Sequence, residues 1–267
     1  MALASSDGFP TLAFAEIVEK SSSPIAMLLP DHEIPSIFKE LFAQAKRPPR
    51  AFVFAHGFSV TYGKLPFSPG DDVVLVAPKG IGVRLRGLYQ AGSGVMGVLG
   101  VEQDGSGEAW NLAESIGAGL GCARVGLVKS SFAEETNADL LSEQVILCGM
   151  LPRLVALCVE FLVKKGVNPK VATYECLNET GLITDMMIRK GIAGMYRDVS
   201  PTARFGGLRA ADRILAGAGL DEKLEELWSE ITSGKFAEEF RREMESGSPF
   251  MKHAMRKFEN HVADKNL

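Results

Sequence analysis

Short apolar runs alternate with helical patterns along the first half of the chain. Each run is bounded by glycine, proline or aspartate, and the intervening segments, such as His32–Lys46 and Ala109–Gly117, have helical character. Short, almost wholly apolar runs are typical of parallel strands buried on both faces. The pattern therefore predicts an α/β sheet, with strands at Pro24–Pro30, Ala51–Ala55, Asp72–Pro78, Val95–Val101 and Ala123–Val128.

The second half, from about residue 126, has no such runs and predicts an all-helical domain. Its long helical patterns cover Asp139–Lys165, Pro169–Gly191, Asp221–Ile231 and Phe236–Val262. Pro152 lacks an N–H group, so we expect the first helix to kink or divide there. Leu140–Val163 is apolar nearly all round, which predicts a helix buried in a core that a partner subunit could complete.

Composition and charge restrict the class of protein. Of 267 residues, 46% are hydrophobic and 23% charged, as in ordinary globular proteins. The net charge of −4 argues against nucleic acid or an anionic membrane as the main partner. No uninterrupted apolar run reaches about 18 residues, and the N-terminus lacks the basic and apolar regions of a signal peptide. The four cysteines form no C-x-x-C pair, so we expect free thiols and a cytoplasmic protein.

Two pairs of carboxylates stand out in the helical half. Asp139 and Glu143 are four residues apart, as are Glu175 and Glu179. On a helix this spacing puts both side chains on one face. Their neighbours are apolar, and four buried carboxylates would be costly without a cation. Hard oxygen ligands suit Mg²⁺ or Mn²⁺, although solvated helix faces would give the same spacing.

Several segments of the chain resemble ketol-acid reductoisomerases. The metal-binding helices of that family are matched by SFAEETNADLLSEQVILC and YECLNETGLITD, and its nucleotide-domain loops by FAHGF, VAPKGIG and VEQDGSG. The resemblance covers nearly the whole chain, and the length of the helical half is similar to the short form of the family. These segments are Ser131–Cys148, Tyr174–Asp185, Phe54–Phe58, Val76–Gly82 and Val101–Gly107.

The resemblance implies both a fold and a set of site residues. Residues 1–125 would form a truncated, Rossmann-like parallel sheet, and residues 126–267 an all-α, knotted domain that binds metal and substrate. The family shares its active sites across a homodimer and acts on a small carboxylic acid. By resemblance, two Mg²⁺ ions would be held by Asp139, Glu143, Glu175 and Glu179, catalysis would involve Glu143, Glu179, Lys79 and His56, and Ser200 would bind the substrate carboxylate.

The chain also departs from the family. No G-x-G-x-x-G turn follows an early strand, and the glycines of Gly92–Gly97 lead into a strand, which is the wrong context for a phosphate loop. The histidine of the family's ECLHE motif is Asn178, and Pro201–Arg204 differ from the residues expected after the substrate serine. We therefore expect NADPH use to be weakened or lost, with cofactor-binding residues unknown. Either the protein has lost this unit or the chain is truncated.

Three functions follow from these observations. The main expectation is a Mg²⁺-dependent enzyme that shifts an alkyl group in a small oxygenated carboxylic acid with little or no use of NADPH. One alternative is a genuine NADPH-dependent ketol-acid reductoisomerase of branched-chain amino acid biosynthesis, present as a truncated chain. The other is a non-catalytic binding or scaffold protein that keeps the fold, which the intact carboxylate set disfavours.

Overall fold

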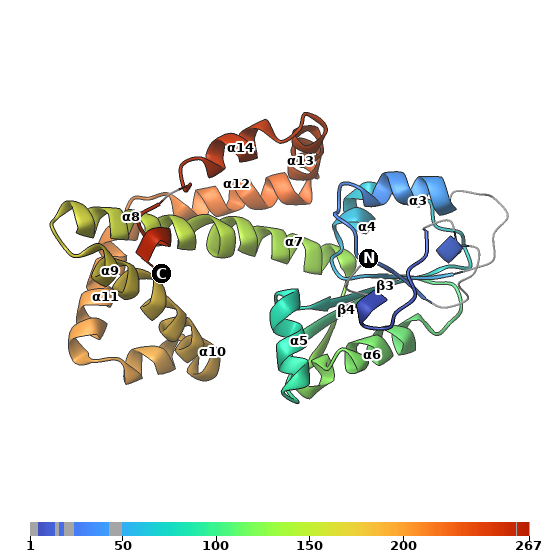
Figure 1. The fold of residues 1–267 in the computed structure, drawn as a ribbon, viewed down its shortest axis with the longest axis horizontal. Helices are drawn as coiled ribbons and strands as arrows, with labels where there is room; N and C mark the ends of the chain where they lie inside the picture. The colour runs from blue at the N-terminus through green and yellow to red at the C-terminus, as the bar shows by residue number, and fades with distance from the viewer. Residues whose placement is uncertain (1–4, 14–15, 19–23, 43–49, 260, 267) are drawn as a thin grey trace. The chain divides into compact units, whose positions relative to one another are not determined.

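The computed structural model describes residues 5–13, 16–18, 24–42, 50–259 and 261–266. These residues form a five-stranded sheet followed by helices, and the chain divides into two compact units, Met1–Asp139 and Leu140–Leu267. The division falls later than the boundary expected at residue 125. Figure 1 shows the sheet with its helices and the helical second unit, and the strands are β1 (Ile25–Met27), β2 (Ala51–Phe54), β3 (Asp72–Pro78), β4 (Gly97–Asp104) and β5 (Leu127–Ser130).

The strands lie in the order β1-β2-β3-β4-β5, so the α/β prediction is confirmed. One pairing differs from a fully parallel sheet, because β4 runs antiparallel to β3 while β1–β2, β2–β3 and β4–β5 are parallel. Gly97, the first residue of β4, pairs with Pro78, the last of β3. The chain between them, which includes α5 (Gly82–Gln90), returns to the end of β3 that it left. Burial on both faces gives the same apolar pattern in either direction, so the sequence could not show this reversal.

The sheet has a separate core on each face. On one face, aromatic side chains of α3 (Ile34–Phe42) pack with β2 and with Phe132. On the other, α6 (Ala109–Gly119) brings Ala109 and Ala113 against valines of β2 and β3. The expected helix His32–Lys46 is thus α3, and its residues 43–46 lie outside the described part of the chain. Both faces of the sheet are therefore covered by packed apolar side chains.

One continuous helical stretch runs from Phe132 to Lys164. It consists of α7 (Phe132–Ser142), a π-helical segment η2 (Glu143–Met150) and α8 (Leu151–Lys164). The kink expected at Pro152 is therefore a change to wider turns just before the proline. A proline has no N–H for the preceding turn and its ring crowds the carbonyl four residues back, which a widened turn relieves.

This stretch is not buried within a single chain. The expectation of a helix buried on all sides is therefore wrong for one chain taken by itself. Ile146, Leu147 and Phe161 are each more than half exposed. By length and composition the stretch could cross a membrane, but a single helix of this kind is weak evidence, because the core helix of a soluble protein passes the same test. Among the described residues of the second unit, one core cluster is built around Val159, Ala172 and Ala263, while Leu182, Ile188 and Phe205 are more than half exposed.

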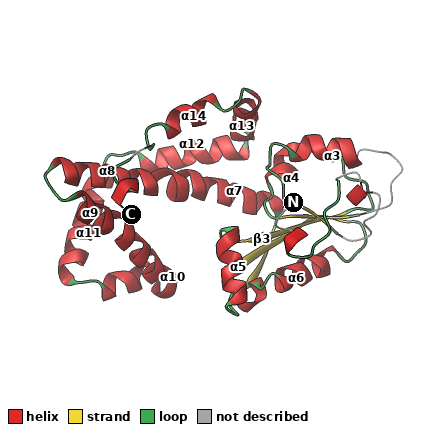
Figure 2. Ribbon diagram, in the orientation of Figure 1, coloured by secondary structure: helices red, strands yellow, loops and turns green. Residues whose placement is uncertain are grey.

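Further helices complete the second unit (Figure 2). The predicted helix Pro169–Gly191 is divided among three of them and extends to Asp198, with an interruption at Gly191, where φ is 70°. The predicted helix Phe236–Val262 breaks at Gly247 and Ser248, both at positive φ. The remaining elements are α9 (Pro169–Thr173), η3 (Tyr174–Asn178), α10 (Glu179–Asp198), α11 (Pro201–Leu215), α12 (Leu220–Thr232), α13 (Lys235–Glu245) and α14 (Pro249–Met255) in this half, α4 (Phe58–Gly63) in the first, and two single 3₁₀ turns, η1 (Cys122–Arg124) and η4 (Asp264–Asn266). All four cysteines are free thiols.

Candidate active site

Two predicted site residues follow neighbouring parallel strands. His56 comes after β2 and Lys79 directly after β3. The strands themselves are almost wholly buried and apolar, so the first polar side chains occur where the chain leaves the sheet. Ligands of open α/β sheets bind outside the carboxyl ends of strands, which is where these two residues lie.

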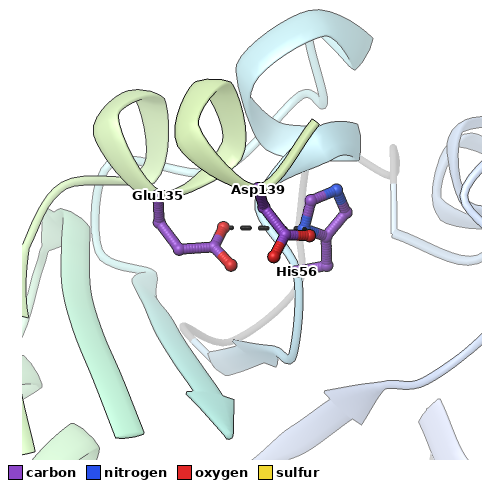
Figure 3. A group of neighbouring side chains, drawn as sticks. All are labelled: His56, Glu135 and Asp139. Carbon is purple, nitrogen blue, oxygen red and sulfur yellow. Dashed lines mark ion pairs between the residues drawn. The ribbon is translucent and has the colours of Figure 1, made fainter. Parts of the chain in front are cut away.

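Helix α7 brings two carboxylates to these strand ends (Figure 3). The Nζ atom of Lys79 lies 2.6 Å from Oε1 of Glu135 and 3.0 Å from Oδ1 of Asp139. The Nδ1 atom of His56 is 3.5 Å from an oxygen of each carboxylate. The Glu135 side chain is only 1% exposed, whereas those of His56 and Asp139 are about one quarter exposed, at 25% and 27%. The cluster therefore has a buried acidic centre and an accessible rim.

Close contact between α7 and the β2–α4 turn depends on Gly57. A Cβ atom on Gly57 would lie 2.2 Å from Oγ1 of Thr136 and 3.0 Å from the backbone oxygen of Phe132. The backbone N–H of Gly57 also donates to Oε2 of Glu135 over 3.4 Å. The absence of a side chain here lets the helix pack close enough for Glu135 to reach His56.

The charges of the cluster stabilise one another. Burial alone would lower the pKa of His56, but the hydrogen bond and charge of Glu135, with the charges of Asp31 and Asp139, outweigh burial and raise it. Burial likewise opposes ionisation of Lys79, whose pKa is raised by Glu135 and Asp139. For Glu135 burial favours the neutral form, yet His56 and Lys79 hold its pKa below the ordinary value. The site thus holds an ionised glutamate between Lys79 and His56, and it favours the charged form of each.

Glu135 is a site residue that sequence reasoning missed. It precedes Asp139 by four residues, as Asp139 precedes Glu143, so all three acids recur at i, i+4 and i+8. This longer repeat was the signal that could have found it, because such spacing puts side chains on one helix face.

The other predicted ligands lie in the second unit. Glu143, Glu175 and Glu179 are exposed, so the expectation that all four carboxylates are buried is wrong for a single chain. Among the described residues, the one group of three potential metal ligands within 4.8 Å of one another is His56, Glu135 and Asp139. The structure of the described chain does not bring the three glutamates together.

Ser200 lies at the start of α11 as its N-cap. Its hydroxyl oxygen accepts a hydrogen bond from the backbone N–H of Ala203 over 3.2 Å. Pro201 occupies the first helical turn, where a missing N–H costs nothing. The hydroxyl proton of Ser200 is not used by this cap.

The donor chemistry fits a hard divalent cation. Asp139 has a partly exposed carboxylate at the rim of the cluster, and the three glutamates are exposed on helices. Carboxylate oxygens with remaining access to water are the ligands that Mg²⁺ prefers. Lys79 already neutralises Glu135, so the residues suited to bind metal are those beyond the buried centre.

The fold and this site define a class: an enzyme with a Rossmann-like sheet, a charged cluster at its strand ends and a helical second unit. A semialdehyde dehydrogenase NAD-binding protein from Cupriavidus necator shares the fold, with a TM-score of 0.65 at 15% identity over 86% of this chain and 84% of that one. The family follows from two further matches. Residues 1–126 match the acetohydroxy acid isomeroreductase NADPH-binding domain, and residues 132–266 the ketol-acid reductoisomerase C-terminal domain. The chain belongs to the ketol-acid reductoisomerase family.

Relatives cover almost the whole chain. The ketol-acid reductoisomerase (NADP(+)) of Pyrobaculum calidifontis is 40% identical over 255 residues, which are 96% of this chain and 77% of the relative. That of Pyrobaculum aerophilum is 38% identical over 98% of this chain and 80% of the relative. The solved structure of an NADH-preferring ketol-acid reductoisomerase from an uncultured archaeon has a TM-score of 0.92 at 32% identity, covering 99% of this chain and 80% of that one.

These findings correct the main functional expectation. We expected NADPH use to be weakened or lost because no glycine-rich turn was found. That expectation is wrong, because the NADPH-binding domain model matches residues 1–126 and the relatives are named for NADP(+). They support the alternative of a genuine ketol-acid reductoisomerase. A glycine-rich turn is one short segment of such a domain, whereas the match to the domain extends over residues 1–126.

Proposed function

We propose that this protein is a nicotinamide-dependent ketol-acid reductoisomerase that acts on a small 2-hydroxy-3-oxo acid in branched-chain amino acid biosynthesis. The observation that carries the proposal is the charged cluster of His56, Lys79, Glu135 and Asp139 at the strand ends of a domain that matches the family's NADPH-binding domain. The reaction moves an alkyl group between adjacent carbons and then reduces the resulting keto acid.

Asp139, Glu143, Glu175 and Glu179 are the proposed ligands of two Mg²⁺ ions. Bound Mg²⁺ would supply Lewis-acid polarisation of the substrate oxygens. The accessible Asp139 carboxylate and the exposed glutamates have the oxygen chemistry that this ion needs. Glu143 and Glu179 are also the proposed proton relays.

Lys79 and His56 are proposed to act on the substrate from the sheet side. Because the pKa of Lys79 is raised, the ammonium group stays charged at neutral pH and can donate to an oxygen that gains negative charge. Glu135 accepts from Lys79 and lies beside His56, so one buried carboxylate fixes the orientation of both. Ser200 would donate its free hydroxyl proton to the substrate carboxylate.

The proposed assembly is a homodimer with shared active sites in the cytoplasm. Leu147, Met150, Leu154 and Phe161 leave a long apolar surface exposed on one helical stretch, and such surfaces mark interaction sites.

Cofactor oxidation tests the proposed activity. A suitable substrate is 2-hydroxy-2-methyl-3-oxobutanoate, the simplest acid of this class with a methyl group to move. With Mg²⁺ present we expect it to drive oxidation of NADPH or NADH, and comparison of the two decides the preference. Glu175→Gln should abolish turnover, whereas Glu225→Gln, an exposed glutamate of α12, should not. No oxidation with either nucleotide would overturn the proposal.

A further inference from the structure

Two π-helical segments coincide with the candidate ligands of the second unit. Segment η2 begins at Glu143, and η3 contains Glu175 and ends just before Glu179. Such helices hold well under 1% of residues in soluble proteins and occur often at functional sites. Three of the four proposed ligands therefore lie in or directly beside a rare backbone conformation.

Segment η2 requires a glycine at residue 149. A Cβ atom on Gly149 would lie 1.8 Å from the backbone oxygen of Gln144, five residues back, and 2.9 Å from its carbonyl carbon. No real Cβ comes this close to backbone, so any side chain at residue 149 would force the turn to change. Pro152, two residues after η2, cannot donate to the preceding turn, which further disfavours a regular α-helix there.

Segment η3 has a different support. The hydroxyl of Thr180 donates to the backbone oxygen of Cys176 over 2.7 Å. A regular α-helix would satisfy that carbonyl with the N–H of residue 180. A threonine hydroxyl that bonds to the carbonyl four residues back often bends a helix, and here the bond is made to a residue of η3 itself.

From these contacts we infer that Gly149 and Thr180 are positioning residues, which hold the two π segments and so set the directions of the Glu143, Glu175 and Glu179 carboxylates. The inference rests on the proposed function, in which these carboxylates bind metal. A π turn holds about one more residue than an α-helical turn, so its conversion to α-helix would rotate the helix on one side against the other by about 100°. Such a rotation would turn a ligand away from its ion without unfolding the domain.

Matched pairs of variants test this inference by metal affinity. Binding of Mn²⁺ alone, measured from the paramagnetic resonance signal of the free ion, should weaken by about 10- to 100-fold in Gly149→Ala and in Thr180→Val, as for residues that orient metal ligands. Gly206→Ala adds a Cβ in α11 that meets nothing within 4 Å, and Thr184→Val removes the same kind of hydroxyl bond from the regular part of α10. Both controls should bind Mn²⁺ as the unmodified protein does.

A conservative substitution separates positioning from general damage. Thr180→Ser keeps the hydroxyl and should restore Mn²⁺ affinity, while the thermal midpoint of Thr180→Val should match that of Thr184→Val. If Gly149→Ala does not fold, the Thr180 series decides alone. If the unmodified protein binds Mn²⁺ and Thr180→Val binds it with the same affinity, the inference is overturned while the proposed metal site stands. Absence of Mn²⁺ binding by the unmodified protein overturns the metal site of the proposed function and the inference with it.

Discussion

Glu135 shows how much a single buried side chain decides in this site. Its carboxylate is almost wholly excluded from water, yet it is ionised because Lys79 and His56 are both within reach. Removal of one partner of such a group leaves the remaining charge buried and uncompensated. The titration of His56 and the packing at Gly57 both test this arrangement.

The first concerns the titration of His56. In the metal-free protein we expect Glu135→Gln to lower the pKa of His56, because burial remains while the main opposing charge is gone. With a raised pKa, protonated His56 stabilises the fold below its unfolded pKa, and this contribution is lost as pH rises through the folded value. The lowered pKa of Glu135 acts oppositely: its contribution is present above the unfolded value and lost as pH falls through the folded one.

Chemical shifts of the His56 ring followed against pH would measure this effect. Glu134→Gln is the matched control, since Glu134 is exposed and bonded to Ser130 on the other side of the turn. If the pKa of His56 is the same in Glu135→Gln and in the unmodified protein, Glu135 does not control the charge of His56.

The second prediction concerns the space at Gly57. Gly57→Ala should lower the free energy of unfolding by about 1–3 kcal/mol, the usual cost of forcing extra atoms into a packed site, because the new Cβ meets Thr136 and backbone of Phe132. Urea denaturation would measure it. Gly82→Ala, where a Cβ meets nothing within 4 Å, should leave the free energy of unfolding nearly unchanged. Equal urea midpoints for the two variants would contradict the close packing at Gly57.

At the scale of elements, hydrophobic periodicity predicted most helices and strands, but not their internal geometry. The expected kink at Pro152 is a π-helical segment. The helix predicted to end at Gly191 is interrupted at that residue, where φ is 70°, and a second helical segment continues to Asp198. Hydrophobic periodicity shows which side of a helix is apolar. One extra residue in a single turn changes this pattern too little for a π-helical turn to be predicted. Ser200, the N-cap of α11, is both a residue that stabilises a helix and a proposed substrate-binding residue.

Ser200 is expected to have separable roles in stability and binding. Ser200→Ala should destabilise α11 by about 0.5–2 kcal/mol because the N-cap is lost, whereas Ser200→Asp keeps a capping oxygen. Both remove the side-chain donor, since an ionised aspartate only accepts hydrogen bonds, so both should raise KM for the substrate. Urea unfolding and steady-state kinetics together distinguish the roles. A normal KM in Ser200→Asp would remove Ser200 from the proposed substrate site.

At the scale of the whole molecule, the exposed apolar surface of the helical stretch predicts a dimer with shared sites. Asp139→Asn and Glu175→Gln should each fail to bind metal. If each site takes Asp139 from one chain and Glu175 from the other, co-refolding the two variants should restore about a quarter of the sites, namely one in every heterodimer.

Calorimetric titration with Mg²⁺ after co-refolding would count these sites, and light scattering would give the mass. The double variant Asp139→Asn/Glu175→Gln, refolded with either single variant, should restore none. A monomer at micromolar concentration, or no recovery in the mixed sample, would exclude shared sites.

The knot expected from the family resemblance also stays a prediction at this scale.

The sequence by itself determined the class of fold, the change from sheet to helices and the residues that bear charge. Apolar runs and acid spacing are local, and a local pattern is enough to predict strands, helices and the polar residues that follow them, such as His56 and Lys79. Only the tertiary structure decided the reversed β4, the role of Glu135 and the close approach at Gly57. Strand direction, burial of one acid among several and the space beside a glycine all depend on atoms contributed by segments far apart in the chain, which no local pattern specifies.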